Sequence, residues 1–348
     1  MKRILCTGAA GFISSWVCRD LLKRGHFVIG VDDLSGGFHE NVAPLLAQYP
    51  HQFLFYKQDV GNYAAMKETM LAHRPEIGVH CASNAREGAS FFSPHDITYR
   101  NAMIGATLLE LGILHKMQRF VFFSSMSVYG EGRVPFDEKA KRAPVDVYGV
   151  NKLSMEMMIE QLAPVHGFTY VILRPHNVIG IGQSMVDPFR NVAAIFCNRV
   201  LLGEPLYIFG ENHKRAFSAI EDSLPCFIRA ILNETLTETI INVGGKEAVT
   251  IDELAQVVIE QFPEKKVEII HTPPRYGEVP LAFATFARSE ELLGYEERVG
   301  WRESIKRMAA WARQQAPNGK PWRFSPLPLM TEAAPLPWKK LNNFTNKS

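Results

Sequence analysis

A glycine-containing turn near the start of the chain, Thr7-Gly8-Ala9-Ala10-Gly11-Phe12-Ile13-Ser14, limits the fold more than any other segment. It follows the apolar segment Arg3–Cys6 and opens a segment with helical periodicity, so it predicts a strand, a tight turn and a helix. Gly8 and Gly11 let the backbone approach a ligand closely, and the positive end of the helix favours a pyrophosphate. Ser14 is small enough to keep the helix near the strand. The turn therefore predicts a dinucleotide-binding site.

The first half of the chain alternates between short apolar segments and longer segments with helical periodicity. Near-continuous apolar strands separated by helices are typical of a parallel sheet that helices cover on both faces. We therefore predict an α/β fold with a doubly wound parallel sheet, the Rossmann arrangement. The predicted strands are Ile4–Cys6, Phe27–Val31, Phe53–Tyr56, Ile77–His80, Phe120–Ser124 and Tyr170–Leu173, and the predicted helices are Phe12–Arg24, Ala64–His73, Ile97–His115 and Val147–His166.

Acidic residues at strand ends indicate which dinucleotide binds. Asp32 and Asp33 follow the second predicted strand, about 20 residues beyond the glycines, where a carboxylate accepts hydrogen bonds from ribose hydroxyls and repels a 2′-phosphate. Asp33 shares this role or caps the following loop. Asp59 and Val60 follow the third predicted strand and suit a position beside the adenine, although an aspartate at a strand end is also a common turn former. The pattern favours NAD over NADP as the cofactor.

After about Arg174 the alternation stops, and the second half predicts a smaller α/β lobe. Such a lobe would lie over the carboxyl ends of the strands and hold a substrate beside the cofactor. We predict an NAD-binding domain in residues 1–175 and a substrate lobe in residues 176–316, with the chain crossing back to the sheet around residues 210–245. The predicted lobe elements are a helix at Phe189–Leu202, a strand at Leu206–Phe209, a helix opened by the capping box Thr250-Ile-Asp-Glu253, and helices at Ser289–Leu293 and Ser304–Gln314.

Residues 317–348 form a tail of different composition. They contain six prolines, together with Trp322, Trp338 and Phe344. Proline-rich composition is typical of a disordered or loosely draped segment, whereas the aromatic residues suit an arm that packs on its own subunit or on a partner. The sequence leaves both interpretations open.

Composition argues against several other classes of protein. The chain is 47% hydrophobic and 21% charged with a formal net charge of +2, which disfavours a nucleic-acid-binding or polybasic membrane surface. Its five cysteines are scattered and lack metal-ligand spacing, so we predict neither disulfides nor a metal site. No stretch approaches the ~18 apolar residues of a membrane span, and the N-terminus enters a strand without a secretory leader. We expect a cytoplasmic protein.

Tyr148 and Lys152, in the sequence Tyr148-Gly-Val-Asn-Lys152, are candidates for acid–base chemistry. Residues four apart share one helix face, about 5–6 Å apart between Cβ atoms, so the lysine can lower the pKa of the tyrosine from its usual value of ~10. Upstream, Ser124-Ser125-Met126-Ser127-Val128-Tyr129-Gly130 follows a strand at the carboxyl edge of the sheet. A serine hydroxyl there can bind a substrate hydroxyl, and acyl transfer is disfavoured because no Gly-x-Ser-x-Gly motif surrounds it.

Five motifs at family spacing resemble those of the extended short-chain dehydrogenases/reductases, the group that includes nucleotide-sugar epimerases and dehydratases. The resemblance runs from Lys2 to about Arg313 and leaves only the tail outside it. It rests on Thr7-Gly-Ala-Ala-Gly-Phe-Ile13, Val31-Asp-Asp-Leu-Ser35, Ser124-Ser-Met-Ser-Val-Tyr-Gly130, Tyr148-x-x-x-Lys152 and Leu173-Arg-Pro-His-Asn-Val178.

The resemblance implies a role for each matching residue. Tyr148 resembles the catalytic base, Lys152 the cation that lowers the pKa of that base and binds the nicotinamide ribose, and Ser125 the hydroxyl that binds the reacting sugar oxygen. The implied cofactor-binding residues are Gly8, Gly11, Phe12, Ile13, Asp32, Asp33, Asp59, Val60, Ala82, Asn101, Tyr148 and Lys152. The implied substrate-binding residues are Ser125 and, at the diphosphate, Asn177, Arg215 and Arg275.

The implied reaction is NAD-dependent epimerisation of a nucleotide-diphosphate sugar, at C4 of a UDP-sugar, through a transient 4-keto intermediate. The 4,6-dehydratases resemble one another in carrying Asp-Glu where this chain has Met126 and Ser127, so dehydration is disfavoured. A UDP-uronic acid 4-epimerase or decarboxylase remains an alternative, and a dinucleotide sensor on the same fold is a non-enzymatic one. The family also implies a homodimer formed through the helices that contain Asn101 and Tyr148.

Overall fold

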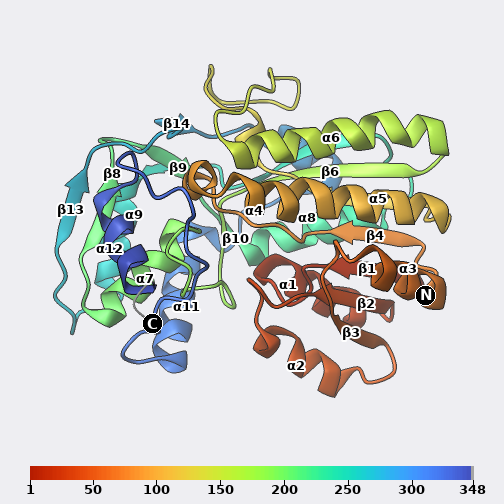
Figure 1. Cartoon of the computed structure of the whole chain (residues 1–348), viewed down its shortest axis with the longest axis horizontal. Coiled ribbons are helices and arrows are strands. Elements are labelled where there is room, and N and C mark those ends of the chain that lie inside the picture. The colour runs from red at the N-terminus through yellow and green to blue at the C-terminus, as the bar shows by residue number, and fades with distance from the viewer. Residues whose placement is uncertain (346–348) are drawn as a thin grey trace.

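The computed structural model describes residues 1–345, and its centre is a seven-stranded parallel sheet in the order β11-β6-β5-β4-β1-β2-β3. The strand order reverses at β1, which pairs with β2 on one side and β4 on the other. The predicted doubly wound sheet is thereby confirmed (Figure 1). The strands are β1 (Arg3–Thr7), β2 (Phe27–Asp32), β3 (Phe53–Lys57), β4 (Ile77–His80), β5 (Arg119–Phe123), β6 (Thr169–His176) and β11 (Thr239–Gly244).

Helices cover both faces of this sheet, and each face has its own apolar core. On one face, α1 and α8 contribute Leu21 and Phe227, while on the other α3, α5 and α6 contribute Met66, Leu108 and Met155. The strands are apolar almost throughout because both of their faces are buried. The helices are α1 (Phe12–Lys23), α2 (His39–Gln48), α3 (Tyr63–His73), α5 (Ile104–Leu114), α6 (Val147–His166) and α8 (Ile220–Leu232).

The helix predicted over Ile97–His115 is interrupted, which corrects the sequence prediction. A short helix, α4 (Pro94–Thr98), is followed by a π-helical turn, η2 (Tyr99–Met103), before α5 begins. Asn101 lies in that turn, and its side-chain amide donates a hydrogen bond to the carbonyl oxygen of Ile97 at 2.8 Å. Asparagine side chains that bond nearby backbone groups compete with regular helix, and π-turns are frequent near functional sites.

After β6 the chain leaves the main sheet and later returns to it. A short parallel pair, β7 (Val178–Ile179) with β10 (Ser218–Ala219), lies between the two regions. From β10, α8 leads directly to β11, which pairs in parallel with β6. The main sheet therefore contains a strand from the second half of the chain.

The remaining segments of the second half form a smaller lobe, at the left of Figure 1. Buried side chains such as Phe196, Leu254 and Trp301 form its core. Thr250 Oγ1 accepts a hydrogen bond from the amide of Glu253 at 3.0 Å, which confirms the predicted helix start. The lobe elements are α7 (Val192–Leu202), β8 (Leu206–Phe209), β9 (Lys214–Ala216), β12 (Ala248–Thr250), α9 (Ile251–Glu260), β13 (Ile269–Thr272), β14 (Leu281–Ala282) and α11 (Gly300–Gln315). The helix predicted at Ser289–Leu293, α10 (Ala287–Leu293), instead packs against α8 and β11 of the main sheet.

The proline-rich tail packs on its own chain. The amide of Arg323 donates to the carbonyl oxygen of Val186 at 2.8 Å, and the amide of Leu329 donates to that of Phe92 at 3.0 Å. Trp338 is only 4% exposed. It lies in α12 (Leu336–Thr345), which Figure 1 shows on the lobe side of the molecule. The side chain of Phe344 and residues 346–348 lie outside the described part of the chain.

Three further observations concern residues 1–345. Cys6, Cys18, Cys81, Cys197 and Cys226 are free thiols. No cluster of three or more His, Cys, Asp or Glu side chains in this part of the chain is arranged to hold a metal ion. None of the helices described here is long and apolar enough to cross a membrane.

Candidate active site

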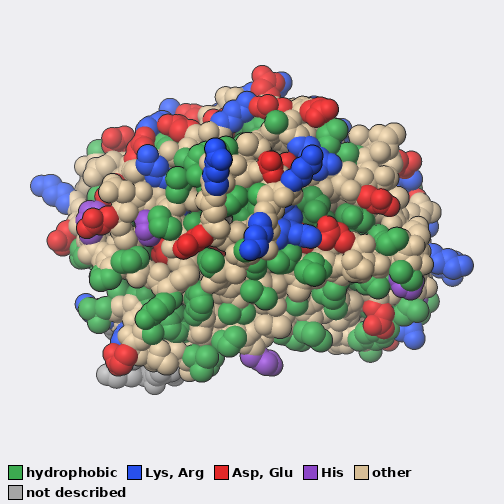
Figure 2. All heavy atoms as spheres, turned by 90° about the horizontal axis from the view of Figure 1, so that it is seen from above, with side chains coloured by type: hydrophobic (Ala, Val, Ile, Leu, Met, Phe, Trp, Pro, Cys, Tyr) green, Lys and Arg blue, Asp and Glu red, His purple; other side chains and the backbone are tan. Residues whose placement is uncertain are grey.

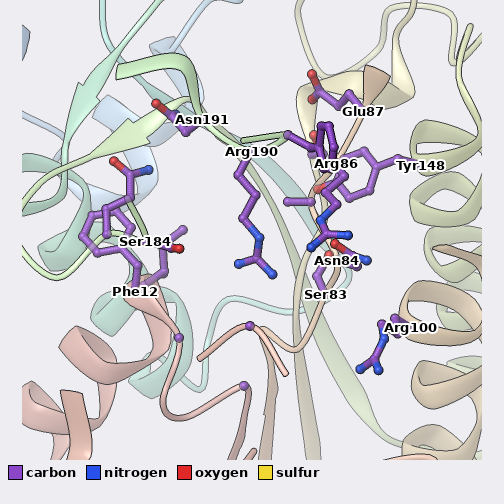
Figure 3. Close-up of a pocket in the computed structure, with 18 of the residues that line it drawn as sticks. Phe12, Ser83, Asn84, Arg86, Glu87, Arg100, Tyr148, Ser184, Arg190 and Asn191 are labelled. Carbon is purple, nitrogen blue, oxygen red and sulfur yellow. The ribbon is translucent and has the colours of Figure 1, made fainter. Parts of the chain in front are cut away.

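A cavity of about 450 Å³ lies between the carboxyl edge of the main sheet and the lobe (Figure 3). Small-molecule sites typically measure ~300–1,000 Å³. In open α/β sheets, ligands bind outside the carboxyl ends of the strands where the strand order reverses, and this cavity occupies that position. It is lined by every predicted site residue except Asn101.

The glycine turn forms one wall of the cavity. Gly8 has a φ of +67°, and a Cβ atom there would lie 2.8 Å from the backbone nitrogen of Ala82, so only glycine fits. Gly11 immediately precedes α1, and no described side chain caps that end of the helix. The first backbone N–H groups of α1 are therefore available to an anion. These features fit the pyrophosphate of a dinucleotide, with Phe12 and Ile13 beside it.

Asp32, at the end of β2, borders the cavity. Its carboxylate accepts hydrogen bonds from the amides of Ala10 (3.0 Å) and Leu34 (2.8 Å). Burial raises the pKa of Asp32, and these two hydrogen bonds act in the opposite direction. Because each carboxylate oxygen can accept more than one hydrogen bond, Asp32 can still receive ribose hydroxyls.

The two other predicted acids also line the cavity but have protein partners. Asp33 pairs with Arg100 of η2 at 2.8 Å and accepts from the amide of Ser35 at 2.8 Å. Asp59 accepts from the hydroxyl of Tyr99, also in η2, at 3.0 Å. The π-helical turn therefore supplies the partners of both carboxylates and holds them in the cavity wall.

Ser125, Tyr148 and Lys152 meet where the cavity reaches β5 and the start of α6. Asp146 fixes that start, because its side chain accepts from the amide of Gly149 at 2.7 Å. Lys152 Nζ donates to the carbonyl oxygen of Phe123 at 2.7 Å and lies 5.7 Å from the centroid of the Tyr148 ring. The Ser125 hydroxyl lies close enough to the Tyr148 side chain to lower its pKa, and it hydrogen-bonds with Ser127 Oγ at 3.1 Å. A phenol, an ammonium group and an alcohol therefore share one end of the cavity.

Taken together, the protein groups around Tyr148 raise its pKa, although two of its neighbours act in the opposite direction. Burial raises the pKa of Tyr148 well above its ordinary value, and the charge of Glu87 raises it further, against hydrogen bonds from Ser125 and Ser83. Burial also lowers the pKa of Lys152 to about 8. Ionising Tyr148 near neutral pH thus requires more positive charge than Lys152 supplies alone.

Arg215 and Arg275 share one carboxylate, that of Glu278. Arg275 donates Nε and Nη2 to the two carboxylate oxygens at 2.6 and 2.8 Å, and Arg215 Nη2 lies 3.6 Å from one of them. Two guanidinium groups around one carboxylate leave one net positive charge, which suits a pyrophosphate. Asn177 lines the same region and donates to the carbonyl oxygen of Ala216 at 2.9 Å.

Asn101 does not reach the cavity, which corrects its predicted place among the cofactor-binding residues. It is 1% exposed. Its side-chain oxygen accepts from the hydroxyl of Ser83 at 2.6 Å and from the amide of Asn84 at 3.1 Å. Asn101 therefore positions the loop after β4, and that loop forms the cavity wall.

Sequence reasoning missed Glu87, which lies in the same loop. Ser127 Oγ donates to Glu87 Oε1 at 2.6 Å and lies 3.1 Å from Ser125 Oγ. Glu87 and Ser125 both line the main cavity and a smaller one of about 100 Å³ beside it. Glu87 and Ser127 are 40 positions apart in the sequence, so no local motif predicts their hydrogen bond.

A second missed group is built around Asp187. Its carboxylate accepts from Arg86 Nε at 2.9 Å and from Arg190 Nε at 3.0 Å, and the side chains of Arg86 and Asp187 are 7% and 6% exposed. Figure 3 shows Arg190 extending into the cavity between Phe12 on one wall and Asn84 on the other. The only sequence signal was a pair of opposite charges near the start of α7.

A doubly wound sheet with a glycine turn shaped for a dinucleotide defines a Rossmann-type dinucleotide-binding protein. Residues 4–244 match the model of the NAD-dependent epimerase/dehydratase family. The chain therefore belongs to that family, and its cofactor is NAD.

Three similar proteins illustrate the range of activities among its relatives. The UDP-glucose 4-epimerase of Thermotoga maritima, solved with UDP-glucose, is 31% identical, and the match covers 90% of this chain and 99% of that one with a TM-score of 0.82. The UDP-glucuronic acid 4-epimerase of Bacillus cereus, solved with UDP-glucuronic acid and NAD, is 26% identical over 90% and 99%, with a TM-score of 0.81. A UDP-N-acetyl-alpha-D-glucosaminuronate decarboxylase of Bacillus cytotoxicus is 26% identical over 90% of this chain and 98% of its own.

Proposed function

We propose that this protein interconverts the C4 epimers of a UDP-hexose through a transient 4-keto sugar. The observation that carries the proposal is the convergence of Ser125, Tyr148 and Lys152 at one end of the cavity. The glycine turn and the arginine pair line the same cavity. A sugar attached to a diphosphate held by Arg215 and Arg275 can therefore reach both Tyr148 and the cofactor.

Each residue then has a defined part in the reaction. Tyr148, as the phenolate, removes the proton of the C4 hydroxyl, and Ser125 binds the same oxygen. When bound by the glycine turn and Asp32, NAD⁺ would supply the acceptor and donor of the C4 hydride and a positive charge near Tyr148. Lys152 supplies a second positive charge that stabilises the phenolate. After the 4-keto sugar has turned over, Tyr148 returns the proton to the oxygen as the hydride reaches the opposite face, so C4 is inverted.

NMR of product stereochemistry tests the proposal. The purified protein is incubated, without added cofactor, with UDP-glucose, UDP-glucuronate, and GDP- and TDP-sugars. A C4-inverted product without net NADH supports the proposal. A pentose product would assign decarboxylation. A 4-keto-6-deoxy product would assign dehydration, for which Glu87 offers the carboxyl group that positions 126 and 127 lack. An unchanged set of sugars, with NAD bound, would favour a dinucleotide sensor.

Glu87 supports a neutral sugar rather than a uronic acid. Its carboxylate lies at the end of the cavity that holds Ser125, so it would repel a carboxylate on the sugar. For Glu87→Gln we expect kcat/KM for UDP-glucuronate to rise about tenfold relative to that for UDP-glucose, which corresponds to ~1.4 kcal/mol of relieved repulsion. Steady-state kinetics with both sugars measures the ratio. Glu131→Gln, which neutralises an exposed acid that does not line the cavity, is the control; equal ratios in the two variants would contradict the prediction.

We further propose a homodimer formed through η2, α5 and α6. Met103 and Leu114 are 55% and 59% exposed, and Val150 and Met157, seven residues apart on α6, are each 51% exposed. Spacings of seven place side chains on one helix face. Figure 2 views the molecule from the top of Figure 1, where α6 lies, and shows hydrophobic side chains spread over the lower half of the picture. Val150→Arg is expected to convert a dimer into a monomer in light scattering, whereas a monomeric wild type would contradict the interface.

Two other assignments support the same function. Because all five cysteines are free, we assign the protein to the reducing cytoplasm. We assign cofactor binding to residues 1–175 and substrate binding to residues 176–316, since Gly8 and Asp32 come from the first segment and Arg215 and Arg275 from the second.

A further inference from the structure

The tail reaches the same cavity as the predicted substrate residues. Pro337 and Trp338 line it together with Phe209 and Arg275. The similar proteins described above match 90% of this chain but 98–99% of their own length, so about a tenth of this chain has no counterpart in them. The tail itself contributes side chains to the wall of this cavity.

Trp338 is fixed in place by several aromatic side chains. Its ring lies 5.1 Å from that of Phe189 and 6.1 Å from that of Phe92, both in edge-to-face geometry. A Cβ atom on Gly88 would lie 3.0 Å from the outer edge of the indole, so glycine at this position leaves the space that Trp338 occupies. The indole is thus a packed part of the wall and has little freedom to move away.

Trp338 also contacts the arginine predicted to hold the diphosphate. The guanidinium carbon of Arg275 lies 5.4 Å from the Trp338 ring centroid and 4.6 Å from that of Phe209. Glu278 accepts from Nε and Nη2, and within residues 1–345 Nη1 has no hydrogen-bond acceptor. Two aromatic rings and one carboxylate therefore hold the guanidinium group while leaving Nη1 for a ligand oxygen.

We propose that the C-terminal tail completes the nucleotide-sugar site, with Trp338 positioning Arg275 for the diphosphate and forming the outer wall of the nucleotide end. The proposal rests on the proposed function, because it assumes that a nucleoside diphosphate binds beside Arg275. It names Trp338 as a positioning residue: the indole acts through the guanidinium group it contacts. Binding of NAD around Gly8 does not depend on Trp338.

Calorimetric titration of UDP into the NAD-loaded protein tests this proposal without requiring turnover. Trp338→Ala is expected to weaken UDP binding about tenfold, the order of one desolvated cation–π contact. Trp338→Phe, which retains an aromatic face, should lose about threefold or less. Bound NAD should match the wild type in both variants, whereas Trp338→Ala should lower the melting temperature because it removes a buried indole.

Trp322→Ala is the matched control. Trp322 belongs to the same tail but donates to Glu204 at 3.2 Å and does not line the cavity, so UDP binding should remain at the wild-type value. Equal UDP affinity in Trp338→Ala and the wild type would overturn the inference, as would an equal loss in Trp322→Ala. A wild type that retains NAD but does not bind UDP would overturn the proposed function itself, and the inference with it.

Discussion

Tyr148→Phe should lower kcat by about 10²–10⁴-fold, the usual contribution of a positioned acid–base group. The variant keeps the ring and removes only the phenolic hydroxyl. The loss should appear in kcat rather than in KM, because the two arginines proposed to hold the diphosphate, Arg215 and Arg275, are unchanged. NAD bound per subunit, measured after denaturation, should not change. Conversion of UDP-glucose to its C4 epimer gives the rate.

Tyr295→Phe provides the matched control. It makes the same chemical change at a buried tyrosine that does not line the cavity, and we expect wild-type kcat. A second check uses pH: the charge of Glu87 raises the pKa of Tyr148, so Glu87→Gln should lower that pKa and move the acid limb of the kcat profile to lower pH. A Tyr148→Phe variant with near wild-type kcat would exclude Tyr148 as the base.

The fold was largely predictable because its signals are local. Strands buried on both faces must be apolar throughout, so each strand from β1 to β6 stands out from the helical segments around it. The interruption at η2 was not predictable in this way. It depends on Asn101 bonding to residues 83 and 84, a contact that exists only once the loop after β4 packs against the helix.

The candidate site likewise contains residues that the sequence predicts and residues that it does not. Gly8 and Gly11, like Tyr148 and Lys152, lie close together in sequence, so their spacing carries the information. Glu87 and Trp338 reach the cavity only through long-range packing: Glu87 contacts Ser127, and Trp338 contacts Arg275 and Phe189. No residue spacing predicts such contacts, and the composition of the tail is typical of a disordered segment even though its aromatic residues also suit a packed arm.

Arg174 makes a buried ion pair that ties the active-site helix to the sheet. Arg174, in β6, and Glu156, in α6, are both fully buried, with Arg174 Nε at 2.9 Å and Nη2 at 2.6 Å from the two carboxylate oxygens. Arg174 Nη1 also donates to the hydroxyl of Tyr129 at 2.6 Å. Glu156 in turn accepts from Ser124, next to Ser125, and lies one helical turn beyond Lys152. The pair therefore holds β6, α6 and the segment that carries Ser125 in one fixed arrangement around the proposed catalytic residues.

Arg174→Met is expected to lower the free energy of unfolding by about 3–5 kcal/mol, because it leaves the Glu156 carboxylate buried without its main partner. Chemical denaturation of the NAD-loaded protein measures the loss. The double variant, Arg174→Met with Glu156→Leu, removes the unpaired buried charge and should recover most of the lost free energy of unfolding. Arg298→Met breaks a pair whose side chains are 75% and 62% exposed and should leave stability unchanged. If Arg174→Met proved no more harmful than Arg298→Met, the pair would not hold α6 on the sheet, and Ser125 and Tyr148 would owe their alignment to apolar packing instead.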